Sequence, residues 1–238
     1  MKSLINSKIE AIDGEIGKLD DFYFDDRSWG IRYMVADTAK WIEGRKVLLS
    51  PVVVQEPDIP YKHIPVKLTK QQIQNSPDID TKKPVSRQYE VEFSEQYFWP
   101  AYGLTEFDLP SMDNEDLIHE KDTSLSSGDP HLRSINEVLQ YNIGALDGDI
   151  GHVDDVLLDT ESWTIHFWVV KTRNWLPGKK VLISPHWINL ISWEDKKVFV
   201  DVPAETIRNS PEYDPDKPMQ AEYEEELNHY YGSARMNS

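Results

Sequence analysis

The stretch DGEIGKLDDFYFDDRSW, residues 13–29, returns with few changes as DGDIGHVDDVLLDTESW, residues 147–163. The same shift of 134 residues aligns positions 11–97 with the second half of the chain without a gap, with about 32 identical residues. A fixed shift of this length indicates a duplicated structural unit. The sequence therefore predicts one copy over 1–99, a second over 132–232 and a tail at 233–238.

The residues between the copies have a different composition. Acidic residues, Ser, Gly and Pro dominate 100–131 and leave no apolar period, which is typical of a linker. After it, Leu132, Ile135, Val138 and Leu139 follow helical spacing. We expect an acidic linker that leads into a short helix.

Within each copy the signals are those of short strands. Asp-Gly at 13–14 and 147–148, between apolar residues, predicts a hairpin, and strands are expected to start at Trp29 and Trp163. Helical signals come late, with a Thr69/Gln72 capping box and Pro203 at a first helical position. The predicted fold class is mainly β, with two small barrels in tandem that each end in a short helix.

Several motifs carry a resemblance to a known family. They are D-G-x-I-G-x-x-D-D, then T-x-x-W-x-x-G-[RK]-K-V-L-[LI]-S-P, then I-x-N-S-P, in both copies. The chain resembles the PRC-barrel family, a β-barrel module named for the cytoplasmic domain of the photosynthetic reaction-centre H subunit. The module also forms the carboxy-terminal domain of the small-subunit ribosome maturation factor. The resemblance implies an interaction module with no catalytic residue to transfer, and a pseudo-twofold relation between the copies would imitate a dimer.

Composition excludes several classes of function. With 25 Lys and Arg against 42 Asp and Glu, the formal net charge is −17, which disfavours nucleic acids and anionic membranes as partners. The absence of cysteine excludes disulfides and thiolate chemistry. No apolar run is long enough to span a membrane, and we expect a soluble protein of the cytoplasm.

The carboxylates of the repeated stretch allow two interpretations. Asp20, Asp21, Asp25 and Asp26, with their counterparts in the second copy, could hold a hard cation. Alternatively they mark a β-bulge and a turn, because the apolar residues change face near the Asp pair. The spacing does not match a calcium-binding loop, so we favour the bulge and expect no metal and no other cofactor.

Aromatic residues supply the candidates for binding a partner. One group lies before a glycine in the same turn of each copy, and the other follows an i, i+4, i+8 pattern near the end of each copy. The candidates are Trp41, Trp175, Tyr89, Phe93, Tyr97, Tyr223, Leu227 and Tyr231. Packing within the chain is the alternative for all of them.

Three functions remain to be distinguished. The first is a non-enzymatic protein-interaction or adaptor module with a protein partner or a second copy of itself. The second is a peripheral component of a photosynthetic or electron-transfer membrane complex, as the H-subunit resemblance implies. The third is an enzyme, which we disfavour because the seven histidines have no counterpart in the other copy and no nucleophile motif accompanies them.

Overall fold

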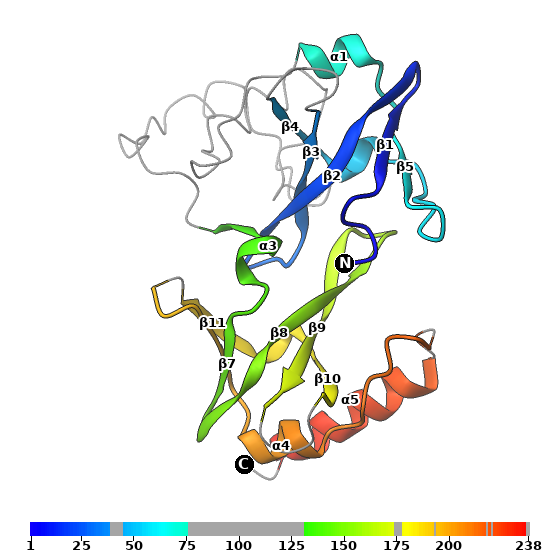
Figure 1. Cartoon of the computed structure of the whole chain (residues 1–238). Helices are drawn as coiled ribbons and strands as arrows, with labels where there is room; N and C mark the ends of the chain where they lie inside the picture. Colours follow the sequence, from blue (N-terminus) through cyan, green and yellow to red (C-terminus); the bar gives the residue numbers. More distant parts are fainter. Residues whose placement is uncertain are drawn as a thin grey trace, which may run out of the picture. The chain divides into compact units, whose positions relative to one another are not determined.

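The computed structural model describes residues 1–38, 45–75, 131–173, 178–192, 194–217, 219 and 221–236. Two compact units, each with its own β-sheet, make up the chain, which is mainly β as predicted (Figure 1). The amino-terminal unit comprises Ser3–Arg27 and Arg32–Leu132, and the carboxy-terminal unit comprises Met1–Lys2, Ser28–Ile31 and Arg133–Ser238. Two short pieces of the first copy therefore belong to the carboxy-terminal unit.

The sheet of the amino-terminal unit has the strand order β4-β3-β2-β1-β5. Its strands are β1 (Lys8–Ala11), β2 (Gly14–Asp25), β3 (Ile31–Asp37), β4 (Lys46–Leu49) and β5 (His63–Pro65), and β6 (Leu132–Ser134) pairs with β2 outside this order. The short helices η1 (Pro51–Val53) and α1 (Lys70–Gln74) stand on either side of β5 in the sequence. β5 runs parallel to β1, whereas β2 and β4 run antiparallel to their partners β1 and β3, so the sheet is mixed.

The sheet of the carboxy-terminal unit has the order β10-β9-β8-β7-β12-β11. Its strands are β7 (Asn142–Ala145), β8 (Gly148–Asp159), β9 (Thr164–Thr172), β10 (Lys180–Ile183), β11 (Ile188–Ser192) and β12 (Lys197–Val200). The strand β6 (Leu132–Ser134) and the expected short helix, α3 (Ile135–Val138), precede this sheet. The remaining helices are η3 (Pro185–Trp187), α4 (Ala204–Asn209) and α5 (Ala221–Met236).

The element bounds of the two units follow the sequence shift. β2 and β8, β4 and β10, and η1 and η3 each start and end at positions 134 residues apart. The outer strand β11 is the main difference, because the matching residues of the amino-terminal unit form only the isolated bridges Val54–Val66 and Asp58–His63. A proline, Pro57, stands in that stretch and cannot donate to a ladder.

The predicted hairpins are confirmed, with the turn one residue earlier than expected. Ala11 pairs with Gly14 and Ala145 with Gly148, so Ile12-Asp13 and its counterpart form the turn. Gly14, at φ +123°, takes the positive-φ position that follows.

The strands expected to start at Trp29 and Trp163 start later, at Ile31 and Thr164. Trp29 has φ +62° and Trp163 has φ +52°, a left-handed conformation that a strand does not contain. Each tryptophan therefore ends a turn.

The predicted β-bulge is confirmed in the carboxy-terminal unit. The pairing of β8 with β9 shifts between Val153 and Asp155, which leaves Asp154 as the extra residue. This insertion lets Val153 and Val156, three residues apart, both be buried.

Neither sheet closes into a barrel within the described residues, so the expected barrel is not seen there. In the carboxy-terminal unit, two carbonyls of the edge strand β10 have other partners. The carbonyl of Lys180 accepts from the amide of Tyr213 at 2.8 Å, and that of Leu182 accepts from the hydroxyl of Tyr231 at 3.2 Å. The segment before α5 and α5 itself thus occupy the edge where a closing strand would pair.

Other predicted features lie close to their expected positions. The Thr69/Gln72 capping box begins α1, and Pro203 is the N-cap of α4, one residue before its expected place. No described helix is long and apolar enough to span a membrane.

Candidate functional site

Two carboxylates of the repeated stretch form equivalent ion pairs. Asp20 pairs with Lys46 at 2.6 Å, and Asp154 pairs with Lys180 at 2.8 Å. Lys2 adds a second partner to Asp154 at 3.0 Å. Burial alone would raise the pKa of Asp154, but hydrogen bonds from Lys180 and Lys2 outweigh burial and lower it. These carboxylates tie β2 and β8 to the strands two places away in their sheets, β4 and β10.

The remaining carboxylates of the stretch bind backbone amides. Asp21 accepts from the amide of Phe22 at 2.7 Å, and Asp155 accepts from that of Val156 at 2.8 Å. In the turns that follow, Asp25 accepts from Arg27 and Asp159 from Glu161. Aspartates in turns and bulges commonly accept such local hydrogen bonds, and the interpretation of this stretch as a bulge and a turn predicts them.

The aspartates of the Asp-Gly turns cap helices far along the chain. Asp13 accepts from the amide of Lys70 at 2.7 Å, at the start of α1. Asp147 accepts from the amide of Ala204 at 2.6 Å, at the start of α4. Each hairpin tip is therefore fixed to a helix amino terminus.

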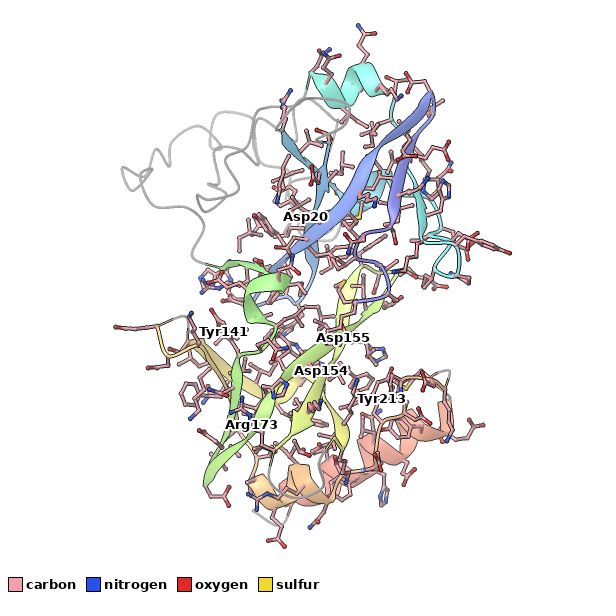
Figure 2. All side chains as sticks on the ribbon, viewed as in Figure 1. Asp20, Tyr141, Asp154, Asp155, Arg173 and Tyr213 are labelled. Carbon is pink, nitrogen blue, oxygen red and sulfur yellow. The ribbon has the colours of Figure 1, made fainter. Side chains whose placement is uncertain are left out.

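The geometry does not favour a metal centre in the part of the chain that is described. No group of three or more His, Asp or Glu side chains is placed there to hold an ion. Figure 2 labels Asp154 and Asp155 on the bulged part of β8, where Lys180 and a backbone amide are their partners.

Three of the described histidines each pair with one carboxylate. His63 lies 2.6 Å from Glu10, His131 lies 2.8 Å from Asp26, and His166 lies 3.0 Å from Glu224. None of these described pairs includes a nucleophile, so the geometry offers no general-base arrangement of the kind found in hydrolases.

The aromatic stripe of α5 packs on its own unit. Leu227 and Tyr231 are buried, and the ring of Tyr231 packs against that of Trp187, with centroids 3.9 Å apart and the planes tilted by 34°. Tyr223 is half-buried and donates to the carbonyl of Pro211. Burial raises the pKa of Tyr223 to about 12. These three candidates therefore have contacts within the carboxy-terminal unit, as the alternative to partner binding predicts.

The other sequence candidates lie outside the described residues. They are Trp41, Trp175, Tyr89, Phe93 and Tyr97. Their partner-binding role stays a prediction.

The turn tryptophans take part in a reciprocal pair of hydrogen bonds within the carboxy-terminal unit. The amide of Ile31 donates to the carbonyl of Trp163 at 2.7 Å, and the amide of Ile165 donates to that of Trp29 at 2.9 Å. Between them, Gly30 and Thr164 form an antiparallel bridge. Gly30 and Thr164 are equivalent under the 134-residue shift, and the same shift turns each hydrogen bond into the other, the pattern that a local twofold axis produces.

Two exposed aliphatic side chains were missed in the sequence. Ile12 is 71% exposed and Leu146 is 65% exposed, and they occupy the same position of the two hairpin tips. Their backbones are fixed, because the amide of Ile12 binds the carbonyl of Leu68 and the amide of Leu146 binds that of Val202. In the sequence, a large aliphatic residue precedes Asp-Gly in both copies. Because the turn was expected at Asp-Gly itself, this residue was assigned to the strand before the turn.

Comparison of the sequence with models of known protein families and with curated proteins finds no match. The function of the chain is therefore inferred from its residues and their geometry.

Proposed function

We propose that the chain is a non-enzymatic protein-interaction module built from two PRC-like copies, with a protein as its partner. The observation that carries the proposal is the pair of hairpin tips. Ile12 and Leu146 are large, aliphatic and more than half exposed at equivalent positions. Folding does not require an apolar side chain at such a place, whereas apolar anchors are typical of the centres of protein interfaces.

The contacts of the repeated stretch support the same proposal. Its carboxylates bind lysines, turn amides and helix amino termini in equivalent pairs, so a structural role accounts for them. The equivalent element bounds and contacts also support a duplication of one PRC-like ancestor.

A pull-down from native lysate with the full chain, read by mass spectrometry, tests the proposal. We expect the wild type to retain specific proteins and the double variant Ile12→Ser, Leu146→Ser to lose them. Val52→Ser is the matched control, because Val52 is 59% exposed but has His186, not an aliphatic residue, at the equivalent position.

Two outcomes would contradict the proposal. One is capture of nothing above background by the wild type. The other is equal capture by the wild type and the double variant. Recovery of the wild type only in the membrane fraction would instead favour a peripheral membrane component.

A further inference from the structure

The carboxy-terminal sheet carries a row of polar side chains across its strands. The register places Lys197 opposite Asn142, Asn142 opposite His152, His152 opposite Lys171, and Lys171 opposite Lys180. Directly opposed residues share one face of a sheet, with Cβ atoms about 5 Å apart. The adjacent residues Val153, Val170 and Val198 are buried on the opposite face. The row therefore lies on the outer face.

Only part of this positive charge is neutralised. Lys197 pairs with Asp149, and Lys180 pairs with Asp154. For Lys171 and Arg173, no acidic partner exists among the residues that the structure describes. Arg173 follows β9 two residues after Lys171, and its amide binds the carbonyl of Ile150 on β8. Two cations without an acidic partner among the described residues thus lie two positions apart, in a protein of net charge −17.

His152 lies opposite Lys171 on the neighbouring strand β8. Its Nδ1 atom is buried, and the described part of the chain offers it no hydrogen bond. Burial and the nearby charge of Arg173 lower the pKa of His152. An anion beside the ring would reduce the repulsion between His152 and Lys171.

At the equivalent positions of the amino-terminal sheet, more of the positive charges have acidic partners. The position equivalent to Lys171 is Asp37, opposite Lys46, and Lys8 and His63 each have a glutamate partner. The excess positive charge is therefore specific to the carboxy-terminal unit.

We propose that Lys171, Arg173 and His152 form a binding site for a compact phosphate group. Two fixed cations and a ring that can take up a proton match a doubly charged oxyanion, and the guanidinium can bind two of its oxygens. Asp149 and Asp154 flank the row, and the net charge repels long polyanions, so a single phosphate group fits better than nucleic acid. That a phosphorylated partner protein carries this group rests on the function proposed above.

An NMR titration of the full chain with inorganic phosphate, at ionic strength held constant with sodium chloride, tests the site. We expect saturable shifts of the Arg173 Nε–H and His152 ring signals, and a rise in the pKa of His152 on binding. Lys171→Asp, which installs the residue of the other copy, should weaken binding at least about tenfold. Arg173→Gln should also weaken binding, while Lys18→Gln, at the position equivalent to His152, should not. Shifts that fail to saturate, or equal affinity in Lys171→Asp, would overturn the site.

The source of the phosphate is tested separately in the pull-down. We expect phosphatase treatment of the lysate and the Lys171→Asp variant each to reduce partner capture. Capture that resists both would overturn the assignment to a partner, even if inorganic phosphate binds. Because the hairpin-tip variant tests the interaction function through other residues, failure of one proposal is distinguishable from failure of the other.

Discussion

Gly17 and Gly151 occupy equivalent places where a backbone carbonyl of the neighbouring strand passes close by. A Cβ atom on Gly151 would fall well inside contact distance of the Lys171 carbonyl oxygen, and one on Gly17 would meet that of Asp37 in the same way. Neither obstacle is a flexible side chain, so the strands would have to separate. At these two positions glycine is required by the sheet itself.

Gly151→Ala should therefore lower the free energy of unfolding by about 2 kcal/mol or more, since overpacking against backbone forces the strands apart. Gly17→Ala should behave alike. Gly232→Ala is the control, because open space surrounds Gly232 in α5 and alanine favours a helix by up to about 1 kcal/mol. Urea denaturation measures all three, and an unchanged midpoint for Gly151→Ala would contradict the close approach.

His152 makes stability depend on pH. Its pKa in the folded chain lies below the ordinary 6.5, so between these two values the unfolded chain binds more protons. The stability of the fold should fall as pH decreases through 6.5. In His152→Gln the loss between pH 7.5 and 5.5, measured by urea denaturation, should be smaller than in the wild type. Equal losses in the two proteins would show that His152 is not held in its neutral form.

At the scale of elements, hairpins, turns and the bulge could be predicted because they depend on residues close in sequence. The spacing of Ile150, Val153 and Val156 indicates a change of face, and the extra residue Asp154 provides it. The closure of the sheet could not be predicted, because it depends on what meets β10 from the far end of the chain. Tyr231, 49 residues after Leu182, binds that edge.

The row from Lys197 to Lys180 was also hidden in the sequence. Some of its members come from strands that are distant in the chain, and the registers of β7 with β8 and of β8 with β9 include bulges, such as the one between Ile143 and Gly144. A shift of one residue would place Val153 opposite Lys171 and remove the row. The candidate phosphate site can therefore be recognised only when the register of the strands is known.

Helix α5 is an integral part of the carboxy-terminal unit because its apolar face is buried. Leu227→Ala should cost about 3 kcal/mol through lost burial and a cavity, and Tyr231→Phe about 1 kcal/mol through the bond to Leu182. Glu225→Gln, on the exposed face of the helix, is the control and should leave stability unchanged. If the urea midpoint of Leu227→Ala equals that of the wild type, α5 does not pack as described, and its aromatic stripe is available to a partner.

At the scale of the whole molecule, the two copies share three recurring features and differ in two others. The capping aspartates, bulge ion pairs and hairpin tips recur, so they belong to the shared scaffold and to a surface kept in both copies. The copies differ in two places: Lys171 replaces Asp37, and β11 replaces the stretch that contains Pro57. Under the proposed duplication, the recurring features describe the ancestor and the differences describe what the second copy gained.

The reciprocal bonds of Ile31 and Ile165 provide a test of the local twofold pattern. Each amide donates to the carbonyl before the opposite bridge residue, at 2.7 and 2.9 Å, and both bonds flank the Gly30–Thr164 bridge. Because the bridge must open to release either amide, their hydrogen exchange should be slow and similar in rate. Hydrogen exchange followed by NMR measures both rates in one sample. Protection of one isoleucine amide with rapid exchange of the other would show that the bridge is one-sided and that the twofold pattern does not extend to these bonds.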